Sequence, residues 1–428
     1  MISVWLAETV SIASLLLVIG AYVFVSRHDR SYINVVTPIF LTTVPAYYLF
    51  PLLYTYWFGT EASTYAYVYV YATSAFESWV FAYFYTRPRT RLITLPFAYG
   101  YNNFAGLAFA SLFAAGLMYL PILLEFRQDI LNPRRIYEQT RIGFGGSFFL
   151  SSTLAYLAVV LILFSGKPFR TKAIVVAASA VVLALHGVKS HVMTLLTLLA
   201  IYEVYVRGHK LKFGQAIIVC GGMSLVALGL FVATMALGSP LEALESIAEY
   251  SDYTRNGMMV IDSNFPRQYG RLTWESNVLA VVPRALMPSK PQDFGAYRLD
   301  TEFYPEIMEL GQGAPAFGVG IQYADFGFLA IVYVAVFSAI TGWLARVCLG
   351  RLRQTRHPAD FLLLAFLVGI TIFPVGTGWM FPETLLAAML LRFASCIGAN
   401  KIYREGRRSS NRLQPGRQSA AADGLAGL

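Results

Sequence analysis

Long apolar runs separated by short polar connections make up most of this chain. Eleven runs contain about 20 mostly apolar residues, the length that a helix needs to cross a bilayer. They cover approximately residues 4–25, 34–58, 64–85, 99–124, 146–165, 172–188, 190–206, 214–237, 318–345, 360–375 and 379–396. These runs predict an all-α protein, a polytopic transmembrane helix bundle of about 11 spans within a range of 10 to 13.

One polar stretch of roughly 80 residues interrupts the pattern. It divides the chain into transmembrane helices 1–8 over residues 1–237, a large loop over 238–318, transmembrane helices 9–11 over 319–396 and a tail over 397–428. The tail is polar and rich in Gly, Ser and Ala, so we expect it to be disordered. A membrane protein with one large extramembrane loop usually does its work there.

The composition agrees with a membrane protein. Hydrophobic residues make up 57% of the 428 residues and charged residues only 13%, whereas a soluble domain carries about a quarter charged residues. The net charge of +9 is better explained by basic cytoplasmic loops than by nucleic-acid binding. The three cysteines lie in apolar segments, so no disulfide framework is predicted. No basic residue precedes the first apolar run, which argues against a cleaved signal peptide.

Basic residues are unequally distributed between the two sides that the spans define. Of the 33 Lys and Arg residues, 22 lie in alternate connections, the last predicted span and the tail on one side, and 11 lie on the other side. Because basic loops stay in the cytoplasm, the N-terminus and the large loop are predicted outside and the C-terminus inside. The basic residues predicted outside run against this trend and call for a functional reason.

Several mechanisms lack their signatures in the sequence. It shows no nucleotide-binding fingerprint, no metal-ligand spacing and no internal repeat. We therefore predict no cofactor and no metal, and ATP-driven transport by this chain alone is not expected. Nucleic acid is not an expected partner.

Two outer loops concentrate basic side chains. The shorter loop contains Arg135 and Arg141, and the large loop contains Arg271, Arg284 and Lys290. Guanidinium groups bind phosphate and diphosphate through a planar fork of donors. We expect at least two of these side chains to contact an anionic ligand, although any one of them taken alone is equally explained by a structural or snorkelling role.

The large loop also has features of a sugar site. It contains 6 basic and 11 acidic residues, so its negative net charge argues against a non-specific polyanion surface. Tyr269 and Trp274 can stack on sugars, and carboxylates such as Glu275 can bind hydroxyl groups. The alternative is a small folded lid with an aromatic core. Three prolines between residues 283 and 291 prevent a long helix and are expected to hold Arg284 and Lys290 in a turn near the membrane surface.

Charged and titratable residues also lie within or beside the predicted spans. Lys189, between His186 and His191, is the only charged residue in an apolar run of more than 30 residues, which makes it a functional candidate. His191 can act as a general base at the outer surface, or both histidines can simply form a hairpin at headgroup level. Glu77 lies in the middle of its span and either lines an ion path or pairs with another helix.

Three segments carry a family resemblance: His186-Gly-Val-Lys-Ser-His191, Val282-Pro-Arg284 through Pro288-Ser-Lys-Pro291, and Gly318-Val-Gly-Ile-Gln-Tyr-Ala-Asp-Phe-Gly327. Ten residues separate Arg135 from Gly146, and ten separate Arg284 from Gly295. With the many spans and the long outer loop, these features make the chain resemble the Wzy-type O-antigen and oligosaccharide repeat-unit polymerases. The spacings are similar to a pattern in two periplasmic loops of that family.

The resemblance implies a metal-independent membrane glycosyltransferase in the bacterial inner membrane, with its active site on the periplasmic side. Its substrates are expected to be undecaprenyl-diphosphate-linked oligosaccharides. The growing glycan is the donor, and a single lipid-linked repeat unit is the acceptor. A chain-length regulator and a flippase are implied as partners in the same membrane.

The resemblance also implies roles for individual residues. The expected catalytic residues are Arg284, which stabilises the leaving diphosphate, and His191 or Glu275, which takes the proton from the acceptor hydroxyl. The expected substrate-binding residues are Arg135, Arg141, Lys189, Arg271, Lys290, Tyr269 and Trp274.

Three other classes of protein remain open from the sequence. An O-antigen ligase uses the same donor but transfers the glycan to lipid A core. A transporter or flippase of lipids or oligosaccharides is favoured by Glu77 as a coupling site and disfavoured by the long loop. A structural or sensory membrane protein would use the loop only to bind a partner.

Overall fold

The computed structural model describes residues 3–37, 40, 43–87, 103–130, 133–140, 144–222, 252–279, 282, 287–291, 293–306, 316–369 and 382–394. All regular secondary structure within these ranges is helical. The all-α prediction is therefore confirmed. Arg141, Arg284 and the tail from residue 397 lie outside the described residues.

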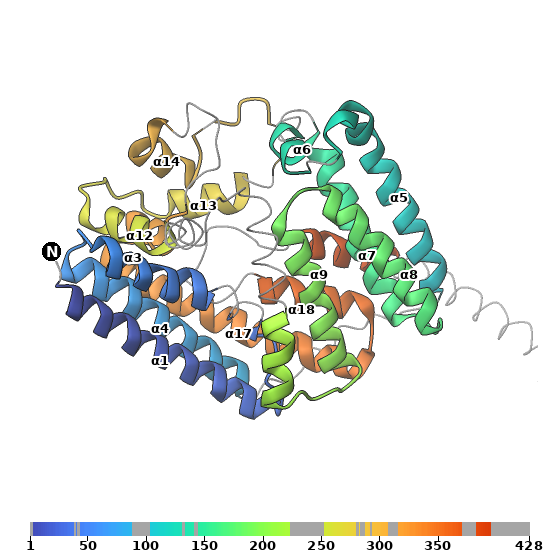
Figure 1. Cartoon of the computed structure of the whole chain (residues 1–428), viewed down its shortest axis with the longest axis horizontal. Coiled ribbons are helices and arrows are strands. Elements are labelled where there is room, and N and C mark those ends of the chain that lie inside the picture. The colour runs from blue at the N-terminus through green and yellow to red at the C-terminus, as the bar shows by residue number, and fades with distance from the viewer. Residues whose placement is uncertain are drawn as a thin grey trace, which may run out of the picture.

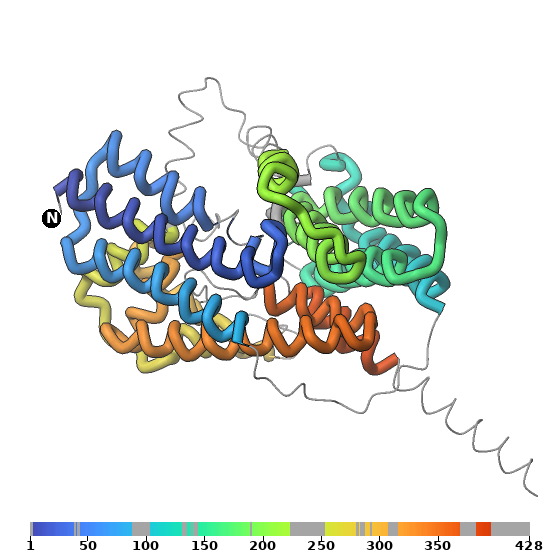
Figure 2. The backbone as a smooth tube through the Cα atoms, turned by 90° about the horizontal axis from the view of Figure 1, so that it is seen from below, coloured from blue at the N-terminus to red at the C-terminus, as the bar shows by residue number. Residues whose placement is uncertain are grey.

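The long helices form two groups that lie side by side (Figure 1). The first group contains α1 (Val4–Asp29), α3 (Phe50–Phe58), α4 (Thr64–Thr86) and α17 (Ala330–Thr355). The second group contains α5 (Phe104–Glu125), α7 (Gly145–Phe164), α8 (Phe169–Leu185), α9 (Lys189–Ile201) and α18 (Pro358–Gly369). Figure 2 shows the same division from below. Helix α17 joins the groups, because it packs on α4 at one end and on α18 at the other.

Within the described ranges, four segments are long and apolar enough to cross a membrane: Val4–Asp29, Phe104–Glu125, Gly145–Phe164 and Gly320–Thr355. Shorter apolar helices cover His191–Val206, Phe213–Gly222 and Pro358–Val368. Exposed apolar side chains also indicate that these helices lie in a lipid bilayer. On α17, Val332, Val336 and Ile340 recur every four residues and are each about half exposed, as expected for a helix face that meets lipid. The structure is that of an all-α membrane protein.

Small and hydroxylated side chains hold the first group together. A Cβ atom on Gly342 of α17 would lie 2.7 Å from the Phe81 carbonyl oxygen of α4, so the two backbones touch at this glycine. Between α1 and α4, the Ser11 hydroxyl lies 2.8 Å from the Tyr67 hydroxyl, and Ser14 donates to the Tyr71 carbonyl at 2.7 Å. Close approach through small residues and hydrogen bonds between helices are the usual means of helix association in a bilayer.

Short helices from the polar loops lie in the upper half of Figure 1, most of them beside the first group and one beside the second. They are α6 (Pro133–Thr140), α12 (Asp252–Asp262), α13 (Arg271–Val278) and α14 (Tyr297–Phe303). Helix α16 (Gly320–Phe326) leads from this region into α17 through a single 3₁₀ turn. At the opposite end of the first group, Arg30, Lys210, Arg346 and Arg353 line one cavity. The structure thus separates the basic connections predicted inside from the large-loop helices predicted outside.

Candidate functional site

Helix α12 is fixed on the first group by a close backbone contact with α16. A Cβ atom on Gly320 would lie 2.8 Å from the Gly257 Cα atom, and a Cβ atom on Gly257 would lie 3.0 Å from the Phe317 carbonyl oxygen. Side chains at these two positions would separate the helices. The glycine-rich segment that begins at Gly318 therefore has a packing role.

Helix α13 is anchored by a carboxylate of α16. Asp325 accepts hydrogen bonds from the backbone amides of Leu272 at 3.0 Å and Thr273 at 2.7 Å. These amides lie in the first turn of α13, where a helix has donors without internal partners and favours negative charge. Gly270 precedes the helix with φ of 88°, in the left-handed region that glycine adopts readily. The segment from Tyr269 to Glu275 is therefore held rigidly against a transmembrane element.

Glu275 links α13 to α14. Its carboxylate accepts from Arg271 Nε at 2.8 Å, Arg298 Nε at 3.0 Å and the Gly295 backbone amide at 2.8 Å, and the residue is buried. Burial alone raises the pKa of Glu275, but the hydrogen bonds from Arg298, Gly295 and Arg271 together lower the pKa below its ordinary value. Glu275 is thus ionised and fully engaged, and its low pKa makes it a weak proton acceptor.

The other predicted residues of α13 lie on its exposed surface. Tyr269 is 86% exposed and Trp274 is 58% exposed, and the Arg271 side chain is also more than half exposed. Arg271 and Trp274 are three residues apart, so they share one helix face. Their exposure leaves the ring faces and the outer guanidinium nitrogens available to a ligand.

Lys290 has a different environment from Arg271. It is buried, donates to the Val282 carbonyl oxygen at 3.2 Å and places its ammonium 4.4 Å from the centre of the Phe294 ring. The Lys290 backbone amide also donates to the Met287 carbonyl oxygen at 3.0 Å, which closes a turn over residues 287–290. The predicted turn around Arg284 falls on residues 283–286, which lie outside the described residues.

Gly295 completes the connection to α14. It has φ of 58°, and a Cβ atom there would lie 2.3 Å from Ser276 Oγ. By contrast, a Cβ atom on Gly146 would meet nothing within 4 Å. The two arginine–glycine spacings seen in the sequence therefore end in glycines of different structural importance.

A second set of predicted residues lies on the second helix group. Arg135 is exposed on α6 and forms an ion pair of 3.1 Å with Asp129. Lys189 is the first residue of α9. His191 is buried, and its Nδ1 lies 2.7 Å from the Tyr156 hydroxyl. The site residues thus divide into an outer α13–α14 segment and a histidine–arginine region on the other group.

Two buried carboxylates have environments that the sequence did not reveal. Asp300 of α14 is 1% exposed, and its carboxylate oxygens have no hydrogen-bond partner among the described residues. Burial raises the pKa of Asp300 to about 7. Glu77 is fully buried in α4, close enough to Tyr47 and Tyr48 to interact electrostatically. The two alternatives for Glu77, an ion path and a contact between helices, both stay predictions.

A cavity of about 580 Å³ opens between α3, α4 and α12, within the size range of small-molecule sites. The Arg255 guanidinium lies 4.0 Å from the centre of the Tyr54 ring at its wall. On the same wall, the Tyr304 hydroxyl donates to Asn256 at 2.7 Å. An aromatic wall with fixed polar groups suits a sugar. The tyrosine-rich spans and Arg255 were visible in the sequence, but their convergence depends on the packing of α12.

Among the residues that the structure describes, no group of three or more His, Cys, Asp or Glu side chains is arranged to hold a metal ion. The positive charge available to an anionic ligand in this region comes from Arg and Lys side chains.

The chain was compared with known proteins. It is 34% identical over 392 residues to proteins named O-antigen polymerase from Salmonella typhimurium (strain LT2) and from Salmonella typhi, and each match covers 89% of this chain and 93% of the relative. No family model matches the chain, and no solved structure does.

Proposed function

Since this chain belongs to the O-antigen polymerase family, we propose that it polymerises lipid-linked oligosaccharide repeat units at the outer face of the bacterial inner membrane. The observation that carries the proposal is similarity to proteins of that name along almost the whole chain, which includes both helix groups and the α13–α14 segment. The exposed arginine and aromatic side chains on α13 support it.

The proposed reaction is a glycosyl transfer between two lipid-linked substrates. A hydroxyl oxygen of the incoming repeat unit attacks the anomeric carbon of the growing glycan. The bond between that carbon and undecaprenyl diphosphate breaks, and the electron pair leaves with the diphosphate. The hydroxyl proton passes to a base of the protein. The activated lipid diphosphate supplies the free energy, so no nucleotide is needed outside the membrane.

Cationic side chains have the central role in this scheme, because the departing diphosphate gains negative charge in the transition state. We assign direct contacts to Arg271 and Arg135, which are exposed, and to Arg284 and Arg141 from their place in the sequence. We assign Lys290, which is buried and donates to the Val282 carbonyl oxygen, to positioning rather than to a direct contact. Lys189, at the first turn of α9, is assigned to the same ligand.

The structure favours different roles for the two base candidates. Glu275 already accepts three hydrogen bonds, so we assign it to positioning Arg271 and α14. His191 is the proposed base. Its Nδ1 is bonded to Tyr156, and its Nε2 has no hydrogen-bond partner within the described part of the chain. We assign proton uptake to this nitrogen, which is buried, so the acceptor hydroxyl has to reach it inside the protein, and Tyr156 holds the ring in place.

Sugar contacts are assigned to Tyr269 and Trp274, whose exposed rings can stack on pyranose faces. Because Arg and Lys supply the charge that a metal would otherwise supply, we propose that transfer continues in the presence of a chelator. A chain-length regulator and a flippase in the same membrane are proposed partners, since the first would set product length and the second would deliver repeat units.

Deletion of the gene, followed by electrophoresis of lipopolysaccharide, tests the proposal. Loss of a polymerase leaves core bearing a single repeat unit and removes the ladder of longer chains. Expression of the protein from a plasmid in the deletion strain should restore the ladder.

Two results would contradict the proposal. Bare core with accumulated lipid-linked polymer would identify a ligase, and repeat units trapped on the cytoplasmic side would identify a transporter. The variant Arg170→Gln, changed at an exposed arginine near the start of α8, serves as the matched control and should restore the ladder.

A further inference from the structure

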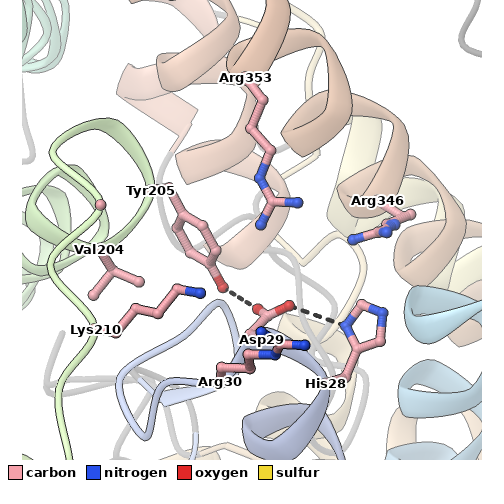
Figure 3. Close-up of a pocket in the computed structure, with 9 residues that line it drawn as sticks. His28, Asp29, Arg30, Val204, Tyr205, Lys210, Arg346 and Arg353 are labelled. Atoms are coloured by element: carbon pink, nitrogen blue, oxygen red, sulfur yellow. Dashed lines mark hydrogen bonds and ion pairs between the residues drawn. The ribbon is translucent and has the colours of Figure 1, made fainter.

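A basic cavity of about 400 Å³ lies at the end of the first helix group that is predicted to face the cytoplasm. Three parts of the chain meet there: the end of α1, the connection that follows the π-helical segment Tyr202–Val206, and the last turns of α17. The charged residues of its wall are His28, Asp29, Arg30, Lys210, Arg346 and Arg353. Figure 3 shows the cationic groups of Lys210, Arg346 and Arg353 directed into the same space.

Asp29 lines the bottom of this cavity, and its carboxylate is bound by tyrosine and histidine side chains and not by the arginines or the lysine of the wall. Its carboxylate accepts hydrogen bonds from the Tyr205 hydroxyl and, at 2.8 Å, from the Tyr85 hydroxyl, and it lies 3.1 Å from His28 Nδ1. The residue itself is buried. This network joins α1, α4 and the Tyr202–Val206 segment, and so fixes the shape of the cavity.

The cations of the wall have no such partners. Across the described residues, Arg30, Lys210, Arg346 and Arg353 form no ion pair with an acidic side chain. Like charges that converge on one cavity repel each other unless an anion lies between them. The positive-inside rule accounts for basic residues in these connections. It does not require residues from three separate segments to face one cavity.

A neighbouring cavity of about 380 Å³ shares Arg30 and Lys210 with the first and has Tyr32, Leu211 and Phe213 in its wall. The Tyr32 and Phe213 rings are in edge contact at 5.2 Å, and Phe213 is 61% exposed. Helix Phe213–Gly222 continues from this point with exposed apolar side chains such as Ile217 and Ile218. A cationic cavity beside an apolar, outward-facing rim matches a ligand with a phosphate at one end and an apolar body at the other.

We propose that the cavity walled by Arg30, Lys210, Arg346 and Arg353 binds a phosphate ester, and that this ester is the headgroup of an anionic phospholipid of the inner leaflet. The phosphate lies between the guanidinium groups and the Lys210 ammonium. The glycerol and the first acyl carbons pass over Arg30 toward Tyr32 and Phe213. A bound lipid links α1, the connection after Tyr202–Val206 and α17, and stabilises their arrangement.

Lipid titration of the full-length protein tests the proposal. The protein is reconstituted in phosphatidylcholine nanodiscs, and phosphatidylglycerol is added while bound lipid and melting temperature are measured. The double variant Arg30→Gln/Arg353→Gln is compared with Lys167→Gln/Arg170→Gln, which removes two charges from exposed residues that line neither cavity. We expect the first to weaken phosphatidylglycerol binding at least about tenfold and to abolish the rise in melting temperature, and the second to behave as the parent.

Parallel titrations with inorganic phosphate and with glycerol 3-phosphate distinguish a lipid headgroup from a soluble phosphate as the ligand. Stabilisation by phosphatidylglycerol alone supports the lipid headgroup. Equal stabilisation by the soluble esters supports a phosphate site but overturns the lipid assignment. Equal losses in the two double variants, or no preference for phosphatidylglycerol over phosphatidylcholine, overturn the site. If the double variant does not fold, the single exposed variant Lys210→Gln replaces it, with the same outcomes at about one-half of the effect on the logarithm of affinity.

Discussion

The two ends of the first helix group use their arginines in opposite ways. On the side predicted to face outward, Arg271 and Arg298 are paired with the buried carboxylate of Glu275. At the end predicted to face inward, Arg30, Arg346 and Arg353 surround a cavity in which Asp29, the one carboxylate among its described lining residues, is bound by tyrosines. Paired arginines hold elements of the fold in place, and convergent arginines without acidic partners point to a ligand. Counting basic residues in the sequence does not separate these cases.

The largest effect is expected from breaking the outer pairing itself. Glu275→Ala leaves two guanidinium groups and the Gly295 amide without their acceptor, and loss of one partner of a buried pair destabilises by about 3 kcal/mol. The control Asp293→Asn removes an exposed partner of Arg298 and should cost less than about 1 kcal/mol. Thermal unfolding in detergent measures both, and equal effects would contradict the role given to Glu275.

Gly295 and Gly146, the two glycines that follow an arginine at the same spacing, can be compared by substitution, because Gly295 is tightly packed and Gly146 is not. Gly295→Ala introduces a side chain at positive φ and against Ser276, so a loss of about 2 kcal/mol is expected together with a loss of long polymer. Gly146→Ala places a methyl group in open space within a helix and should be neutral or stabilising by up to about 1 kcal/mol. The ladder of polymer lengths and the melting temperature together report the difference, and identical behaviour of the two variants would refute it.

Asp300 predicts a pH dependence in the outer segment. Its pKa is raised by burial to about 7, above the value of about 3.9 in an unfolded chain. The stability that the protonated form supplies is complete below about pH 4 and is lost as the pH rises through 7. Asp300→Asn should therefore raise the melting temperature at pH 8, by the equivalent of about 1 kcal/mol or more, and have little effect at pH 4. A similar gain at both pH values would contradict the assignment.

The smallest effect on stability, but a clear effect on activity, is expected for Arg271→Ala. Its side chain is exposed, and an exposed ion pair contributes less than about 1 kcal/mol. Loss of a contact to the departing diphosphate should nevertheless reduce polymer yield by about tenfold or more. Quantification of the lipopolysaccharide ladder at matched expression measures this, with Asp293→Asn as a control on the same surface. Normal yield would exclude Arg271 from the site.

The helical framework was largely predictable, because hydrophobic length alone identifies spans. The hairpin between α8 and α9 was also expected from the sequence and is present, whereas the predicted turn from Arg284 to Lys290 is described only over residues 287–290. These features depend on local residue pattern and on proline chemistry. They do not require knowledge of distant neighbours.

The arrangement of charges in the large loop was not predictable. Glu275 was a candidate base because it lies among aromatic and basic residues, but its partners Gly295 and Arg298 are 20 and 23 residues away. The cap that Asp325 provides for α13 spans more than 50 residues. Similarly, the Arg255–Tyr54 contact joins the large loop to the second predicted span. Such contacts arise only when the loop helices pack on α4 and α16.

The most direct test of the account is extension of a synthetic diphosphate-linked repeat unit by the purified, reconstituted protein. The account predicts a ladder of lipid-linked products without nucleotide and in the presence of a chelator, and its loss in Arg271→Ala/Arg284→Ala but not in Asp293→Asn. Absence of extension by folded protein, or transfer only to a lipid A core acceptor, would contradict it.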